Sequence, residues 1–99
     1  MKHFFSKLIP PRTTFPGDMT PVEAKAMQQH SDYWRALVNA DRAIVLGPVM
    51  DPAGAYGVGI IRATDAAEAR AMVDDDPVIK AGLGFRVDVH PMMSAMVKS

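Results

Sequence analysis

The side chains of this sequence best suited to acid–base chemistry are a histidine in an apolar segment and a run of aspartates. His30 lies between Met27 and Trp34, where a polar side chain needs a hydrogen-bond partner. One interpretation makes His30 a general base whose titration is tuned by a carboxylate. The other makes it a core histidine bonded to a backbone carbonyl, and spacing alone favours this second interpretation.

Asp76 is the candidate carboxylate, and it also has a simple structural explanation. It directly precedes Pro77, which is the position of a helix N-cap. The two roles are compatible, because a capping carboxylate that is held rigid can also orient an imidazole. Asp74 and Asp75 are interpreted as solvated charges, since the run lacks the loop pattern of a hard-cation site.

Two basic side chains near the N-terminus are candidates for neutralising an anionic substrate. Arg12 follows two prolines, and its guanidinium group is suited to binding a carboxylate or a phenolate. Lys7 lies in the first apolar segment. For both residues the alternative is an ordinary surface cation, which on base rates is the commoner case.

The sequence contains no motif for a metal or an organic cofactor. Cysteine is absent, which removes thiolate ligands and thiolate nucleophiles together. The histidines at 3, 30 and 90 lack the close spacing of a helical metal motif. Gly57-Val58-Gly59 lacks the third glycine of the dinucleotide fingerprint and is predicted to admit a bulge or a close backbone approach. We therefore predict no cofactor, and a His-Asp pair needs none for proton transfer.

Length and composition are those of one ordinary globular domain. The chain has 99 residues, 48% of them apolar and 22% charged, which allows a single, modest core. Its 11 basic and 11 acidic residues balance and are scattered, so no nucleic-acid partner is expected. The N-terminal apolar run ends too early for a signal peptide, and no stretch is long enough to span a bilayer. These features predict a cytoplasmic protein with no membrane partner.

Prolines, glycines and capping residues divide the first half of the chain. A strand is predicted at 3–9, followed by an irregular loop at 10–19 of the kind that often forms a lid. Thr20 is predicted to cap a helix, with Pro21 in its first position and Glu23 completing a capping box. One face of that helix carries its apolar residues and the histidine: Met27, His30, Trp34, Leu37 and Val38.

The second half reads as a hairpin, a helical segment and a last strand. Strands are predicted at 42–49 and 56–63, and the turn residues at 51–54 make them antiparallel neighbours. Asp65 and Glu68 are a second capping-box pair before a helix at 66–73. A further helical turn is predicted from Pro77 to Gly82. A half-buried strand is then predicted, which ends at Pro91 and has three inward side chains: Phe85, Val87 and Val89.

The predicted order is βαββαβ, an α+β fold of the ferredoxin-like type with a four-stranded antiparallel sheet. We expect one domain at 1–91 and a C-terminal tail at 92–99. Both main helices would lie on one sheet face, and nothing within the chain would cover the apolar side chains on the other. We therefore expect a homodimer, with or without higher assembly, that packs sheet on sheet.

Three segments in the same order resemble the YCII-related (YciI-like) domain family. Residues 30–37 resemble its first-helix pattern around a histidine, 46–49 its strand-ending Gly-Pro, and 76–83 its Asp-Pro segment followed by Ala-Gly. The resemblance implies a dimeric α+β barrel with a pocket in which His30 and Asp76 act as a pair. Trp34 is expected first as a core residue and second as an apolar wall of that pocket, and Pro48 is expected as a further substrate contact.

These observations predict a small-molecule enzyme of the lyase or isomerase type, acting on a cyclic or phenolic anion. His30 would move a proton, Asp76 would fix its tautomer, and Arg12 or Lys7 would neutralise the substrate. The alternative is a non-catalytic ligand-binding or interaction module built on the same barrel. A haem-dependent oxygenase, a third hypothesis, lacks support from any axial-ligand motif.

Overall fold

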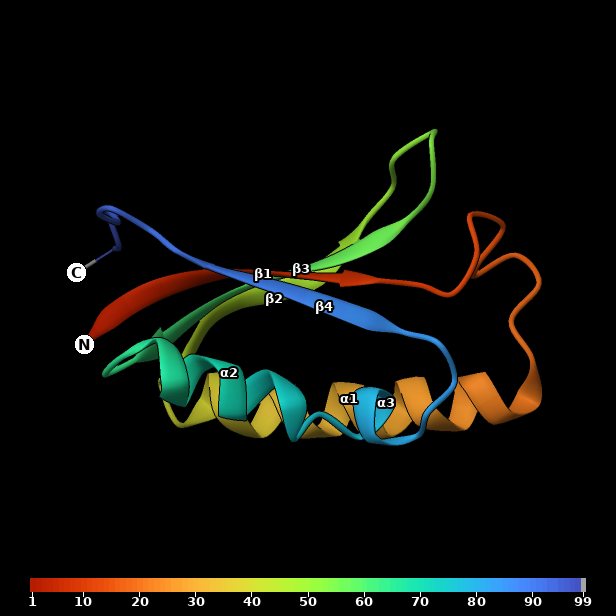
Figure 1. The fold of residues 1–99 in the computed structure, drawn as a ribbon, viewed down its shortest axis with the longest axis horizontal. Coiled ribbons are helices and arrows are strands. Elements are labelled where there is room, and N and C mark those ends of the chain that lie inside the picture. Colours follow the sequence, from red (N-terminus) through yellow and green to blue (C-terminus); the bar gives the residue numbers. More distant parts are fainter. Residues whose placement is uncertain (99) are drawn as a thin grey trace.

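The computed structural model describes residues 1–98, so Ser99, the end of the predicted tail, lies outside the described residues. In Figure 1 the helices of the described chain all lie on one face of a single sheet. The strand order is β2-β3-β1-β4, with every neighbouring pair antiparallel. The predicted ferredoxin-like α+β fold is confirmed. The elements are β1 (Lys2–Ile9), α1 (Pro21–Asn39), β2 (Ala43–Val49), β3 (Tyr56–Ala63), α2 (Ala66–Asp74), α3 (Pro77–Lys80) and β4 (Arg86–Pro91).

Helix α1 begins at the predicted capping box. The Thr20 hydroxyl accepts the Glu23 backbone N–H at 3.2 Å, and the Glu23 carboxylate accepts the Thr20 N–H at 3.0 Å. His30 and Trp34 are buried on the face of α1 that meets the sheet. Val38, which was expected on the same face, is 38% exposed and lies at its margin.

Side chains of β1 alternate between the two faces of the sheet. Phe4, Ser6 and Leu8 point toward the helices and are buried, whereas Phe5 and Lys7 lie on the opposite face. The buried set pairs with the inward positions of β3, because Phe4 lies opposite Ile61 and Ser6 opposite Gly59 in the register. This parity fixes which strand residues can reach a site between the sheet and α1.

Gly59 allows the close approach that its position predicted. A Cβ atom there would lie 2.8 Å from Ser6 Oγ and 2.9 Å from Leu46 Cδ1, which is closer than real side chains come. The irregularity in strand pairing lies elsewhere, on β2 between Ala43 and Val45. The glycine thus leaves room for neighbouring side chains on the helix-covered face of the sheet.

Two clusters of buried residues form the core. The first joins Phe4 and Ile61 of the sheet to Trp34 and Val73 of the helices. The second lies toward the other end and includes Leu8, Phe15, Val78 and Phe85. Phe85 was expected inside the last strand, but β4 begins one residue later and Phe85 is buried as part of the preceding loop.

Helix α2 confirms only half of its predicted capping box. The Asp65 carboxylate accepts the Glu68 backbone N–H at 2.8 Å. The Glu68 carboxylate, however, accepts from the Thr64 N–H at 3.2 Å and from Arg42 Nη2 at 2.7 Å. The strong attraction of the guanidinium group draws Glu68 away from the Asp65 N–H.

The face of the sheet away from the helices carries apolar side chains in register. Phe5 of β1 pairs with Ile60 of β3, and Ile60 pairs in turn with Val45 of β2, which is 52% exposed. No helix lies over this face in Figure 1, where the described chain leaves it open. Among the helices of residues 1–98, none is both long and apolar enough to cross a membrane.

Candidate functional site

A cavity of about 590 Å³ lies between α1 and the sheet. Apolar side chains form most of its wall, and its size is in the range of small-molecule sites. Four of the six predicted site residues line it: His30, Trp34, Pro48 and Asp76. The structure therefore brings the predicted acid–base pair, the aromatic wall and the Gly-Pro strand segment together in one place.

A buried carboxylate joins α1 to the start of α3. Asp76 Oδ2 accepts hydrogen bonds from His30 Nδ1 at 2.6 Å and from Trp34 Nε1 at 2.7 Å. Its other oxygen, Oδ1, accepts the Val78 backbone N–H at 2.9 Å and so caps α3. Asp76 is only 3% exposed. The capping and orienting roles predicted for Asp76 are thus carried out by different oxygens of one carboxylate.

The hydrogen bond to Asp76 determines which ring nitrogen of His30 is available. A carboxylate only accepts, so Nδ1 carries the proton and donates it to Asp76. Nε2 is the nitrogen without a hydrogen-bond partner among the described residues, and the ring lines the cavity. The arrangement gives a fixed imidazole whose Nε2 lone pair is available to a bound molecule.

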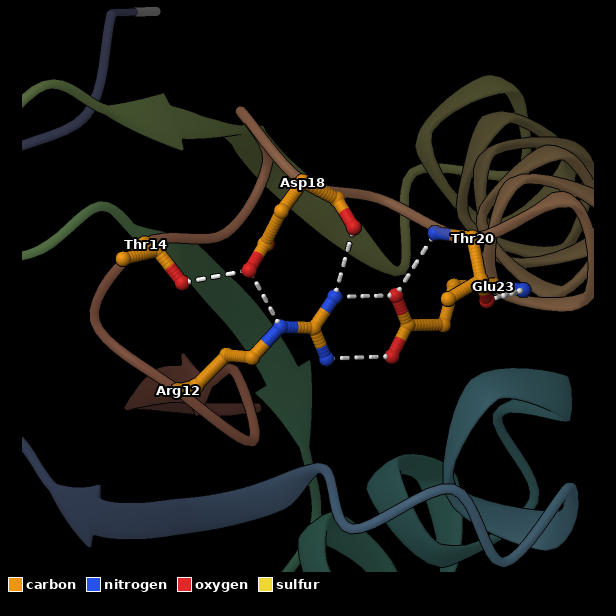
Figure 2. Close-up of polar contacts among 5 residues, drawn as sticks. All are labelled: Arg12, Thr14, Asp18, Thr20 and Glu23. Carbon is orange, nitrogen blue, oxygen red and sulfur yellow. Dashed lines mark hydrogen bonds and ion pairs between the residues drawn. The ribbon is translucent and has the colours of Figure 1, made fainter.

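Arg12 is not where the sequence suggested. Its guanidinium group forms two hydrogen bonds with Glu23, at 2.7 and 2.8 Å, and another with Asp18 Oδ2 at 2.8 Å (Figure 2). Asp18 Oδ2 also accepts the Thr14 hydroxyl at 2.6 Å. Arg12 is absent from the cavity wall, so the expected contact with a substrate is replaced by an internal ion-pair network.

The network around Arg12 is a strong one. Hydrogen bonds from Arg12 and the Thr20 N–H lower the pKa of Glu23 to about 2, far below its usual value. The same guanidinium group, with help from the Thr14 hydroxyl, lowers the pKa of Asp18. Glu23 belongs to α1, whereas Arg12 and Asp18 belong to the preceding loop. The loop is therefore fastened to the N-terminal end of the helix.

The fastened loop supplies part of the cavity wall. Phe15 lies at its middle, lines the cavity and is 7% exposed. Its ring packs edge-on against Phe85, with the centroids 5.3 Å apart. Residues 10–19 contain no helix or strand, as the prolines and glycine predicted, and residues 13–18 form consecutive turns. The loop thus forms a wall of the cavity that is held by the Arg12 ion pairs and by aromatic packing.

Lys7 lies on the wrong face of the sheet to reach the cavity. Its neighbours Ser6 and Leu8 line the cavity, so Lys7 points away from it by the alternation of the strand. The Lys7 ammonium group lies 4.4 Å from the centre of the Tyr56 ring. The expected role of Lys7 in substrate binding is not supported by this placement.

Sequence reasoning missed a cation that does line the cavity. Arg35 of α1 is part of the wall, together with Ser31 and Asn39 of the same helix. The three residues are spaced four apart, so they form one row along α1. That helical spacing was visible in the sequence, but the position of β2 opposite this row was not.

The other histidines are not near the site. His90 lies opposite Phe5 and His3 opposite Arg62, both in register positions on the open face of the sheet. Within residues 1–98, no three His, Asp or Glu side chains gather into a group that could hold a metal ion. The cavity therefore presents acid–base groups and apolar surface as its recognisable chemistry.

Comparisons with known proteins agree with this fold. The family described as "YCII-related domain" matches residues 10–93. The solved structure of an uncharacterized protein from Thermotoga maritima is similar with a TM-score of 0.50 and 13% identity, over 91% of this chain and 94% of that one. No curated protein matches the chain. The structural likeness concerns the fold alone, while the family match spans both His30 and Asp76.

Proposed function

The chain belongs to the YCII-related domain family, and from this premise we propose that it is a small-molecule enzyme that uses His30 for proton transfer. The observation that carries the proposal is the 2.6 Å contact between His30 Nδ1 and Asp76 Oδ2 at the wall of the cavity. A histidine oriented in this way is the usual arrangement of a general base.

The proposed step is the removal of a proton from a bound ring compound. Nε2 of His30 accepts the proton, and the charge that develops on the imidazole is stabilised by the Asp76 carboxylate. The proton is then returned at another position in an isomerisation, or a leaving group departs in an elimination. The apolar wall, with Trp34 and Phe15, suits a cyclic or phenolic body.

Deuterium exchange tests the proposal without knowledge of the natural substrate. A panel of cyclic acids, lactones and phenols with acidic C–H bonds is incubated with the protein in D₂O and followed by proton NMR. We expect exchange into at least one compound, and a loss of about 10²–10⁴-fold in its rate for His30→Gln. The control is His90→Gln on β4, which leaves the cavity unchanged. No exchange with any compound, or full exchange with His30→Gln, would contradict the proposal.

A non-catalytic ligand-binding module is the second candidate, and one observation favours it. His30 and Trp34 both bond to the residue that caps α3, so the network also connects two helices. If the role of His30 is structural, His30→Ala should lower the free energy of unfolding by about 1–3 kcal/mol. If His30 is a site residue, the loss should be small or the variant even more stable. Urea denaturation distinguishes the two.

We also propose that two copies pair through the open face of the sheet. The apolar row of Phe5, Ile60 and Val45 supports this pairing, because a second sheet is a common cover for such a face. Light scattering should give twice the 10.8 kDa of one chain. Ile60→Asp should yield monomers, whereas Val22→Asp, at a 63% exposed position of α1, should not. A folded monomer of the unaltered protein would contradict the proposal.

A further inference from the structure

The arginine of the cavity wall has no ion-pair partner in the described chain. Three ionisable residues of the wall come from α1 and the start of α3: His30, Arg35 and Asp76. Tyr56 is also a wall residue, but its ring lies beside Lys7, on the face of the sheet away from the helices. The Asp76 carboxylate accepts from three donors of the chain. Arg35, in contrast, has no carboxylate within ion-pair distance among the described residues. Arg35 therefore brings to the cavity wall a positive charge that no carboxylate of the described residues pairs directly.

Other arginines of the chain show that this situation is unusual here. Four of them each hold a carboxylate within ion-pair distance: Arg12, Arg42, Arg62 and Arg70. Arg86 resembles Arg35 in having no such partner in the described chain, but it lies on β4 and away from the cavity wall. Among the arginines of residues 1–98, Arg35 alone combines the lack of an ion-pair partner with a place in the cavity wall.

We propose that Arg35 binds the anionic group of the cavity's ligand, which is a carboxylate or phenolate on an apolar ring. The reactivity of that ligand rests on the proposed function, whereas its binding to Arg35 does not. The guanidinium group presents donors in a planar fork that matches a carboxylate. Ser31 and Asn39, one turn before and after Arg35 on α1, add polar groups along the same rim.

The positions of His30 and Arg35 allow one ring-sized ligand to meet both. Arg35 comes five residues after His30, which corresponds to about 7.5 Å along the helix axis and about 140° around it. Because both residues nevertheless line the same cavity, an anionic substituent can meet Arg35 while its ring lies beside the imidazole. Arg35 thus takes the role that the sequence had suggested for Arg12 or Lys7.

Binding of a matched pair of probes tests the proposal. Trp34 is the only tryptophan of the chain and lines the cavity, so its indole N–H resonance reports on occupancy in a ¹⁵N-correlated NMR spectrum. Benzoate and benzamide share one shape and differ in charge. We expect the unaltered protein to bind benzoate about tenfold more tightly than benzamide.

Substitutions assign that preference to a residue. Arg35→Met should remove the preference by weakening benzoate about tenfold and leaving benzamide unchanged, and Arg35→Lys should keep part of it. The matched control Arg86→Met should bind like the unaltered protein. Equal binding of the two probes, no binding of benzoate, or an unaltered preference in Arg35→Met would each overturn the proposal.

The same probes separate this inference from the proposed function. His30→Gln should lose deuterium exchange and keep the preference for benzoate, because Arg35 is intact. If proton transfer is absent from the unaltered protein while the preference depends on Arg35, the catalytic proposal fails and the anion site stands. If exchange depends on His30 while the preference does not depend on Arg35, the opposite conclusion follows.

Discussion

Replacement of Asp76 by asparagine should destabilise the protein although the two side chains have nearly the same shape. Oδ1 accepts one buried N–H, from Val78, and Oδ2 accepts from Trp34 and His30. An asparagine amide offers one oxygen and one NH₂ group. If the NH₂ group takes the place of Oδ1, the Val78 N–H loses its acceptor. If the NH₂ group takes the place of Oδ2, the Trp34 N–H loses its acceptor. At least one buried N–H is therefore left without a hydrogen bond.

The magnitude follows from that count. One buried donor without a partner costs about 1–3 kcal/mol, and the loss of charge weakens the remaining bonds. We expect Asp76→Asn to lower the free energy of unfolding by about 2–3 kcal/mol. For a domain of this size, this corresponds to a decrease of about 10–20 °C in Tm.

Urea and thermal denaturation, followed by circular dichroism, measure the effect, and the neighbouring residue provides a control. Asp75 has the same chemistry, but its side chain is 67% exposed and its contact with Lys80 is 3.5 Å long. Asp75→Asn should change the stability by less than about 0.5 kcal/mol. Equal stability of Asp76→Asn and the unaltered protein, or equal losses in the two variants, would refute the reasoning.

Three further perturbations address the loop and the sheet. Since the pKa of Glu23 is lowered from 4.5 to about 2, its ionised form stabilises the fold above about pH 4.5, and this contribution should be lost as the pH falls toward 2. The difference in unfolding free energy between the unaltered protein and Glu23→Gln should therefore shrink over that range in urea titrations; a constant difference would contradict it. Phe15→Ala should cost about 3–5 kcal/mol in the same assay, because it removes a buried ring packed on Phe85, whereas a loss below about 1 kcal/mol would show that the loop wall is not part of the core. Gly59→Ala should cost about 1–3 kcal/mol, since the new Cβ meets Ser6 and Leu46, and a neutral result in thermal denaturation would mean that both side chains can move aside.

The order of elements was predictable because its signals are local. The capping box at Thr20 and Glu23, the turn between β2 and β3, and the alternation in β4 each depend on residues close together in the chain. The contact between His30 and Asp76 joins residues 46 positions apart. Its prediction came from the resemblance of the motifs to the family, and spacing alone favoured a different role for His30.

The predicted positions that differ from the structure belong to two kinds of side chain. The partner of the side chain lies far away in the sequence, or the sequence pattern does not show which face of the strand the side chain is on. Arg12 was expected in the pocket because the residues next to it in the sequence give no sign of its ion-pair partner. That partner is Glu23, which lies in the first turn of α1. Lys7 was ambiguous because Phe4 and Phe5 are both apolar, so the pattern did not show which parity of β1 faces the helices. Arg35 was overlooked because only the position of β2 reveals that its side of α1 borders a cavity.

The clamp of Arg12 on both Asp18 and Glu23 has a consequence for how such a protein diversifies. The two ion pairs hold the ends of the segment that contains Phe15, while the imidazole and its carboxylate are carried by the helices. Substitutions of Phe15 can therefore enlarge or narrow the cavity at this wall while the contact between His30 and Asp76 stays as it is. One wall of the cavity can thus change its shape independently of the buried hydrogen bonds between the helices.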